Sequence, residues 1–230
     1  MTVLDDVGVA TEFDRAMSRL RDLDPDAPRV YAVANMAVQS RRRWWALASG
    51  GSSGRFAALQ ARAAADRSDP ARASIRVATD LVHCVVGRVA AAFVGVGQVW
   101  DPGPENVWIH LDSDVGIDWV GVRDVTLRDA SGRPPVRGVV SVPCERSLAA
   151  WTAHRASLSL HVVARGLAEL GPVDDAAIAR IVGNSVLGAS ARVPYLGAVD
   201  SEVGWQRGQA LLDAFTDIGL PVRATTNRMT

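Results

Sequence analysis

The chain has 230 residues, of which 25 are basic and 25 acidic, so its formal net charge is zero. Binding to nucleic acid or to an acidic membrane surface needs an excess of positive charge, and we therefore expect neither partner. A hydrophobic fraction of 48% is typical of a globular protein with a sizeable core. All the basic residues are Arg, and the absence of Lys excludes Schiff-base chemistry and Walker-type phosphate binding.

Cysteine usage and hydropathy predict a cytoplasmic protein. Cys84 and Cys144 are the only cysteines, which is too few for a disulfide framework. The N-terminus is acidic and has no secretory signal pattern. The longest apolar run, from Val89 to Trp100, is shorter than the roughly 20 residues that a membrane-spanning helix needs. We therefore expect no membrane span.

Residues 1–70 are expected to form an N-terminal helical region. Apolar residues at helical spacing predict a helix from Thr11 to Leu23, which Pro25 would end. The secondary structure of the segment from Tyr31 to Ala48 is ambiguous in the sequence. Gly50–Gly54 is interpreted as a flexible loop, because a phosphate-binding loop would need a Lys and a preceding strand.

The middle of the chain combines one long helix with several short strands. A helical pattern runs from Ala71 to Val96, directly after Pro70, a residue that is favourable in a first helical turn. Between about 105 and 142, β-branched and aromatic residues then predict a small antiparallel sheet. The expected strands are Val107–Leu111, Ile117–Val122 and Val136–Val142.

Helical patterns return after these strands, at Glu145–Leu170, Asp174–Val193 and Asp200–Ile218. Asp174 and Asp175 are placed to cap the second of these helices. Residues 221–230 are interpreted as a polar tail. The order of the elements predicts an α+β protein that is predominantly helical, with a small central antiparallel sheet.

The helix from Ala71 carries a stripe of polar residues. Arg76, Asp80 and His83 follow one another at helical spacing, and Asp80 can pair with Arg76 one turn earlier. Arg88 lies in an apolar run, where burying an unpaired guanidinium would be costly. It should therefore meet a carboxylate, backbone carbonyls or a ligand.

The helix from Glu145 has a second stripe, composed of Trp151, His154, Leu158, His161 and Arg165. The two histidines are separated by two helical turns, about 10.5 Å along the axis, which is too far for both to bind one metal ion. The stripe is either the polar wall of a pocket or an ordinary exposed face.

Two further features bear on ligand binding. Asn184 lies in an apolar helix, where it is either a hydrogen-bonded core residue or part of a pocket. Small residues around Gly183 would let another backbone approach closely.

Seven tryptophans are a high count, and indole rings near Arg suit flat or delocalised ligands as well as they suit a core. They are Trp44, Trp45, Trp100, Trp108, Trp119, Trp151 and Trp205.

Taken in order, these segments resemble the FhuF-like siderophore-iron reductases. The run from Arg76 to Arg88, followed by Pro102–Trp108, is similar to the central helix of that family and to the segment after it. Leu160–Val163 and Ile181–Gly188 resemble its later helices, where a Gly-Asn pair followed by small residues recurs. The resemblance extends over roughly residues 70 to 220, so residues 71–220 are expected to form an FhuF-like domain.

The resemblance implies a cytoplasmic protein that takes a ferric hydroxamate-type siderophore and aids reductive release of its iron. The family uses a [2Fe–2S] cluster held by four C-terminal cysteines, which two cysteines cannot supply. We therefore expect no cofactor in this chain, and electrons from an external flavin or a ferredoxin-type donor protein. Whether the protein is an enzyme stays open. The alternatives are a non-enzymatic ferric-chelate binder or carrier, and a scaffold subunit with no ligand.

No residue is assigned a catalytic role, and no metal ligand is expected. Arg and His side chains would meet the oxygens of the chelate, and one Trp would stack on it. The residues expected near a chelate pocket are Arg76, His83, Arg88, Trp108, His154, His161, Arg165 and Asn184.

Overall fold

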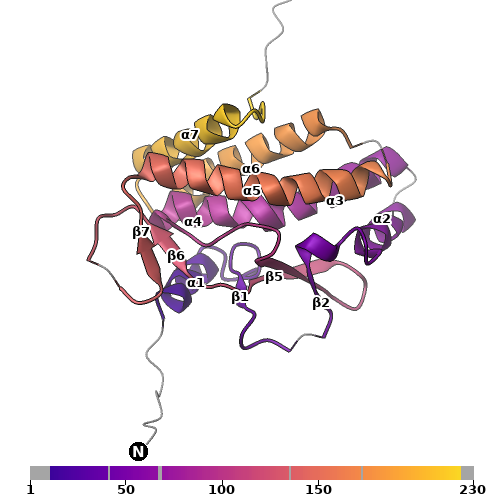
Figure 1. The fold of residues 1–230 in the computed structure, drawn as a ribbon, viewed down its shortest axis with the longest axis horizontal. Helices are drawn as coiled ribbons and strands as arrows, with labels where there is room; N and C mark the ends of the chain where they lie inside the picture. The colour runs from indigo at the N-terminus through magenta and orange to yellow at the C-terminus, as the bar shows by residue number, and fades with distance from the viewer. Residues whose placement is uncertain (1–10, 41, 67–68, 135, 172, 224–230) are drawn as a thin grey trace, which may run out of the picture.

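The computed structural model describes residues 11–40, 42–66, 69–134, 136–171 and 173–223 (Figure 1). Helices make up most of it, and the predicted α+β class with a helical majority is confirmed. The α-helices are α1 (Glu12–Asp22), α2 (Arg55–Ala65), α3 (Pro70–Val82), α4 (Arg88–Val96), α5 (Glu145–Ala168), α6 (Asp175–Tyr195) and α7 (Ser201–Asp217). A 3-10 turn, η1 (Leu47–Ser49), and a π-helical segment, η2 (His83–Gly87), complete the helical part.

The helices begin where side chains can satisfy their first backbone N–H groups. Thr11 and Asp14 form a reciprocal capping box at the start of α1. Asp69 caps α3, with Pro70 as its first residue, as the sequence predicts. The expected cap of α6 is also confirmed, because the Asp174 carboxylate accepts a hydrogen bond from the N–H of Ala177 at 2.7 Å.

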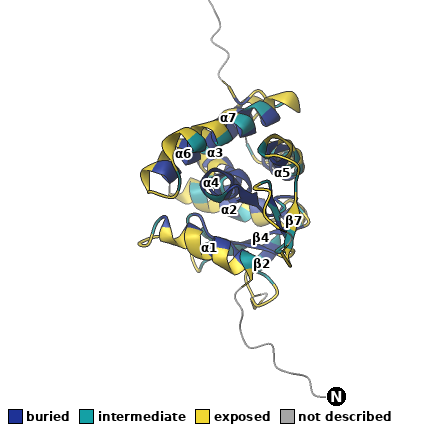
Figure 2. Ribbon diagram, turned by 90° about the vertical axis from the view of Figure 1, so that its left-hand side faces the viewer, coloured by how far each residue is buried: buried dark blue, intermediate teal, exposed yellow. Residues whose placement is uncertain are grey.

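One continuous helix, composed of α3, η2 and α4, passes through the middle of the molecule. It confirms the helix expected over 71–96 and adds a π-helical segment that the sequence pattern did not predict. Figure 2 shows α4 at the centre, with the other helices and the strand β4 around it. Every residue of α4 from Arg88 to Gly95 is buried, as expected for a helix that is apolar all round.

By length and composition alone, the helix Pro70–Val96 could also cross a membrane. Inside this fold, however, 83% of its most apolar window is buried. The core helices of many soluble proteins pass the same test, so this observation is weak evidence for a membrane span.

The strands form two small sheets instead of one. The first sheet has the order β1-β5-β4-β2 and the second has the order β3-β6-β7. β4 and β5 pair antiparallel, as expected, and β2 also pairs antiparallel with β4. β1 pairs with β5 in parallel. The expected third strand, over 136–142, is β7 of the second sheet, where it pairs with β6 in parallel while β3 pairs with β6 antiparallel, so both sheets are mixed. The strands are β1 (Ala34–Asn35), β2 (Trp44–Ala46), β3 (Gln98–Val99), β4 (Val107–Leu111), β5 (Ile117–Val122), β6 (Leu127–Asp129) and β7 (Val139–Ser141).

The N-terminal region contributes strands as well as helices. β1 and β2 both come from the segment that was ambiguous in sequence, and they form the two edges of the first sheet. α1 packs its buried residues, among them Phe13 and Met17, into the same hydrophobic cluster as α4. Residues 11–70 and the rest of the described chain therefore share one core.

α6 and α7 pack closely because small residues line their contact. A Cβ atom added at Gly208 of α7 would lie 2.7 Å from the Cβ of Ser190 on α6, which is closer than two carbon atoms can approach without a shift. Gly183 admits a neighbouring backbone, as predicted, because an added Cβ would collide with the carbonyl of Val222. At Gly188, by contrast, an added Cβ would meet nothing within 4 Å.

Two Gly→Ala substitutions in these helices should therefore have opposite effects. Gly188→Ala should raise the free energy of unfolding by up to about 1 kcal/mol, because Ala has the higher helix propensity and there is room for it. Gly208→Ala should lower it by about 1–3 kcal/mol through overpacking against Ser190. Urea unfolding of both variants measures this difference. Equal stabilisation by the two would contradict the close packing of α6 on α7.

Candidate functional site

The eight residues expected near a pocket lie in separate parts of the structure. Arg76 lines a groove, and Trp108 lies on a sheet face. His83 is partly buried and Arg88 is buried, and both lie beside the segment that precedes β1. The other four are exposed on the outer faces of α5 and α6 and are not brought to the first four. They are His154, His161, Arg165 and Asn184.

The polar stripe of α5 is mainly an exposed helix face. Leu158, in its middle, is 40% exposed, and His154 and Arg165 lie on the same side. His161 borders a depression of about 150 Å³ that it shares with Asp175 and Leu220. The structure therefore leaves most of this stripe on the surface and does not group it with the residues of the central helix. Asn184 is exposed as well, so it is not the core residue that the sequence also allowed.

An open groove of about 450 Å³ lies between α2, α3 and the turn that joins β4 to β5. We call it the α2–α3 groove. Leu59, Val77 and Ile117 contribute apolar surface to it. Its remaining lining residues are Arg62, Ala63, Asp66, Arg76, Asp80, Val115 and Gly116.

Two ion pairs face each other across this groove. Arg76 and Asp80 pair within α3, with Nε 2.9 Å from Oδ2, as the spacing in the sequence predicts. Arg62 and Asp66 form the corresponding pair within α2, and the Arg62 Nε–H also donates to the carbonyl of Asp114 at 2.9 Å. Exposed pairs of this kind contribute little to stability, so a ligand oxygen can replace a carboxylate at either guanidinium without much loss.

The buried Arg88 is paired with backbone, one of the three partners that its apolar surroundings allowed. Arg88 is 4% exposed, and its Nη1–H donates a hydrogen bond to the carbonyl of Ala32 at 2.7 Å. The Nε atom is buried and has no hydrogen-bond partner among the described residues. Burial lowers the pKa of the guanidinium.

His83 acts on the same backbone segment. Its Nε2 lies 2.8 Å from the carbonyl of Val30, to which the ring donates. Burial, and then the nearby charge of Arg88, lower the pKa of His83 below its ordinary value. The two side chains therefore bind residues 30 and 32, just before β1 begins at Ala34. We assign them a structural role, as a clamp between the central helix and the first sheet.

The π-helical segment sets the spacing of this clamp. η2 extends from His83 to Gly87, so the clamp residues lie at its first position and directly after its last. Gly87 has no room for a side chain, because an added Cβ would collide with Nδ1 of His83. π-helical turns occur mostly as single insertions in α-helices and are frequent at functional sites.

Trp108 lies on the face of the first sheet that points away from the helices. Along β4, Val107, Ile109 and Leu111 are buried, while Trp108 and His110 are only partly buried. This alternation is the expected pattern of a strand with one face in the core. The neighbouring strands add Trp44 and Trp119, and we call these four partly buried rings the aromatic face, composed of Trp44, Trp108, His110 and Trp119.

Sequence reasoning missed most of the aromatic face. The period of two along β4 could have joined His110 to Trp108. Nothing in the sequence could have added Trp44, because β2 has three residues and was part of an ambiguous segment. A β-bulge at His110 and Leu111 also brings Asp118 beside His110, with Oδ1 2.6 Å from Nδ1.

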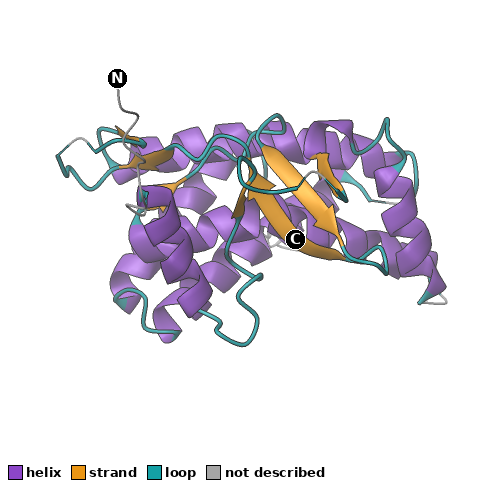
Figure 3. Ribbon diagram, turned by 90° about the horizontal axis from the view of Figure 1, so that it is seen from below, coloured by secondary structure: helices purple, strands orange, loops and turns teal. Residues whose placement is uncertain are grey.

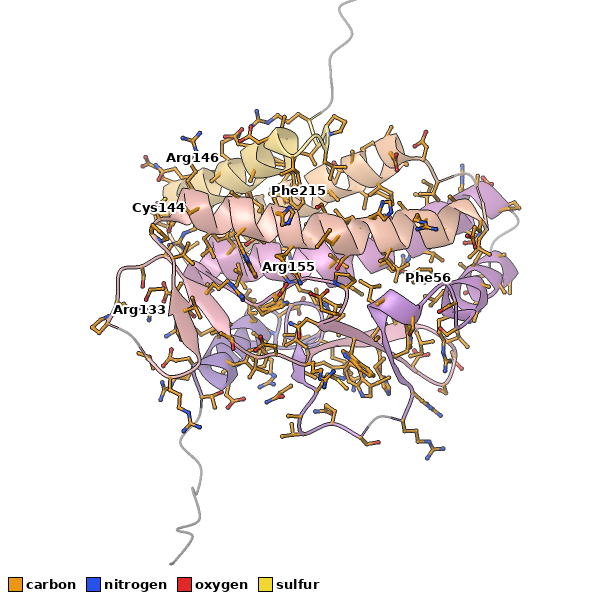
Figure 4. The ribbon with its side chains drawn as sticks, viewed as in Figure 1. Phe56, Arg133, Cys144, Arg146, Arg155 and Phe215 are labelled. Carbon is orange, nitrogen blue, oxygen red and sulfur yellow. The ribbon has the colours of Figure 1, made fainter. Side chains whose placement is uncertain are left out.

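The two cysteines lie in different surroundings. Cys84 is buried in η2, and burial raises the pKa of its thiol to about 11. Cys144 is exposed at the start of α5, where hydrogen bonds from Ser147 lower its pKa. Figure 4 shows Cys144 and Arg146 at the end of the molecule opposite Phe56 of α2. Within the described residues, no three His, Cys, Asp or Glu side chains are grouped so that they could hold a metal ion.

The clamp should make the stability of the fold depend on pH. Because the pKa of His83 is lowered in the folded state, the unfolded chain binds the proton more tightly. Stability should therefore fall as the pH drops below about 6.5, the ordinary pKa of His. We expect the urea midpoint to fall less between pH 7.5 and 5.5 in His83→Gln, whose amide can still donate to Val30. His154→Gln, at an exposed position, should keep the full decrease, and an equal decrease in all three proteins would contradict the assignment.

Comparison of the chain with protein-family models, with curated proteins and with solved structures finds no match.

Proposed function

We propose that this protein binds a ferric hydroxamate-type chelate in the α2–α3 groove, in the cytoplasm, and aids reductive release of the iron. The proposal joins the resemblance to FhuF-like reductases with a groove that holds Arg76, a residue of the resembling segment. The electrons come from an external donor, a reduced flavin or a ferredoxin-type protein, because the chain has too few cysteines for a four-thiolate cluster.

The chemistry of release follows from the preferences of iron. Hydroxamate oxygens are hard donors that hold Fe(III) tightly and the softer Fe(II) much less tightly. One electron added to the bound chelate converts Fe(III) to Fe(II), and the weakened complex then loses its metal. The protein's part is to hold the chelate while the donor approaches. The open side of the groove leaves the bound chelate accessible to that donor.

The observation that carries the proposal is that two guanidiniums, those of Arg62 and Arg76, line the same groove as several apolar side chains. Both guanidiniums can donate hydrogen bonds to the oxygen atoms of a chelate. Without a ligand, each is paired with a carboxylate of its own helix, Arg62 with Asp66 and Arg76 with Asp80. Leu59, Val77 and Ile117 contribute apolar surface against the methylene arms of such a ligand.

A second function is that of a carrier, which binds the chelate without reducing it. The positions of the two thiols favour it, because neither is placed to take part in reduction at the groove. Cys84 is buried with a raised pKa, and Cys144 lies at the start of α5, far from α2. Neither thiol lines the α2–α3 groove. Binding together with protein-dependent trapping of Fe(II) from a reduced flavin supports the reductase function, whereas binding without Fe(II) release supports the carrier.

Neutralising the groove arginines should weaken chelate binding. We expect Arg62→Gln and Arg76→Gln each to raise the Kd for a ferric trihydroxamate about tenfold, since each removes a charge-assisted hydrogen bond of about 1.4 kcal/mol. Equilibrium dialysis, read from the visible absorbance of the chelate, measures Kd. Arg165→Gln is the matched control, because Arg165 is exposed on α5 outside this groove.

The iron-free hydroxamate completes this experiment and should bind more weakly than the ferric form. Two results would overturn the groove assignment: unchanged affinity in both groove variants, or a loss confined to Arg165→Gln. The absence of any chelate binding by the folded protein would remove the iron proposal and leave the scaffold alternative.

A further inference from the structure

The turn between β4 and β5 has an unusual backbone where it lines the α2–α3 groove. Figure 3, a view from below, shows the two longest strands, β4 and β5, and the turn that joins them. Val115 in this turn has a φ of 64°, and among the described residues only Arg43 shares the left-handed region without being Gly. A β-branched side chain adopts this region only under strain, whereas Gly and Asn adopt it readily. A Val at this position therefore lowers the stability of the turn.

Hydrogen bonds hold the turn in this strained conformation. The Asp112 carboxylate accepts from the backbone N–H groups of Asp114 and Gly116, both at 2.8 Å. The N–H of Asp112 donates to the carbonyl of Gly116 at 2.9 Å. From α2, Nε of Arg62 donates to the carbonyl of Asp114, which ties the turn to the opposite side of the groove. Strained residues persist where their surroundings fix them, and they cluster at active sites and ligand-binding sites.

The side chain of Val115 gives this strain a use. Val115 is partly buried, packs against the hydrophobic core and lines the α2–α3 groove. With Ile117 of β5, Leu59 of α2 and Val77 of α3, it gives the groove apolar surface from each of its three elements. Gly or Asn would relieve the strain but would remove this apolar group. The position therefore keeps an isopropyl group on the groove wall at the expense of backbone strain.

An apolar wall can distinguish hydroxamate chelates by what joins their hydroxamate groups. In linear trihydroxamates the three groups are joined by methylene chains, whereas in a complex of three acetohydroxamates they are not joined. The guanidiniums of Arg62 and Arg76 would meet the oxygen atoms of either complex alike. Only the methylene chains gain from apolar contact, and burying about two methylene groups lowers Kd roughly tenfold.

We propose that Val115 is a specificity-determining residue of the α2–α3 groove, which selects ferric hydroxamates whose hydroxamate groups are joined by methylene chains. The isopropyl group of Val115 contacts such a chain, while Arg62 and Arg76 donate to the oxygen atoms of the chelate. This inference rests on the proposed function, because it concerns the same groove and the same class of ligand.

Two uncharged chelates test this inference by equilibrium dialysis. One is the ferric complex of N-acetylated desferrioxamine B, which has methylene chains. The other is the ferric complex of three acetohydroxamates, kept intact by excess acetohydroxamate. The wild type should bind the first about tenfold more tightly. Val115→Asn and Val115→Gly, which suit the left-handed backbone, should each raise the Kd of the first chelate about tenfold and leave that of the second unchanged.

Val115→Ile keeps a branched apolar side chain and should keep the affinity of the wild type for both chelates. Arg43→Asn is the matched control for the backbone, because Arg43 has a φ of 65° and does not line the groove. It should leave both Kd values unchanged, and circular dichroism confirms that each variant is folded.

Three results would overturn the inference and leave the proposed function in place. They are equal binding of the two chelates by the wild type, unchanged affinity of both Val115 variants for the acetylated desferrioxamine complex, and an equal loss with both chelates. A wild-type protein that is folded and binds neither chelate would instead remove the proposed function, and this inference with it.

Discussion

The fold depends on how one buried helix is joined to the sheet beside it. The helix formed by α3, η2 and α4 is surrounded by other elements, so its polar side chains must find partners inside the protein. Arg88 and His83 find them in the carbonyls of Ala32 and Val30. This clamp fixes the chain just before β1, and β1 then pairs with β5. Removing either side chain would leave a buried carbonyl without its donor, which costs about 1–3 kcal/mol.

The β4–β5 hairpin joins the α2–α3 groove to the aromatic face of the first sheet. Its turn, at Val115 and Gly116, closes one side of the α2–α3 groove, and its strands bear Trp108, His110 and Trp119 of the aromatic face. The hairpin is packed on the core through its buried residues. Such a scaffold suits binding, because it holds the side chains of the groove in place before a ligand arrives.

Helices could be predicted well from the sequence, and the site could not. Apolar spacing and capping residues are local signals, so α1, the helix Pro70–Val96 and α5–α7 were found within a few residues of their observed ends. β1 and β2 are too short to leave a pattern, and their pairing depends on contacts far along the chain. The polar stripe of α5 had the spacing of a pocket wall, but which face of a helix is buried depends on its neighbours. Arg76 was identified from its place in a polar stripe of the sequence. Arg62 was not, because it lies beside Arg76 only through the packing of α2 against α3.

The central claim is that a ferric chelate binds between α2, α3 and the hairpin turn. A gallium(III) hydroxamate chelate tests it most directly, because gallium(III) has the charge and nearly the size of iron(III) but is diamagnetic. Changes in backbone amide NMR shifts on titration would map the site. We expect the largest changes to cluster within residues 59–66, 76–80 and 115–117, the segments that contribute the lining of the groove. Changes clustered instead at 154–165 on α5, or no changes at all, would contradict it.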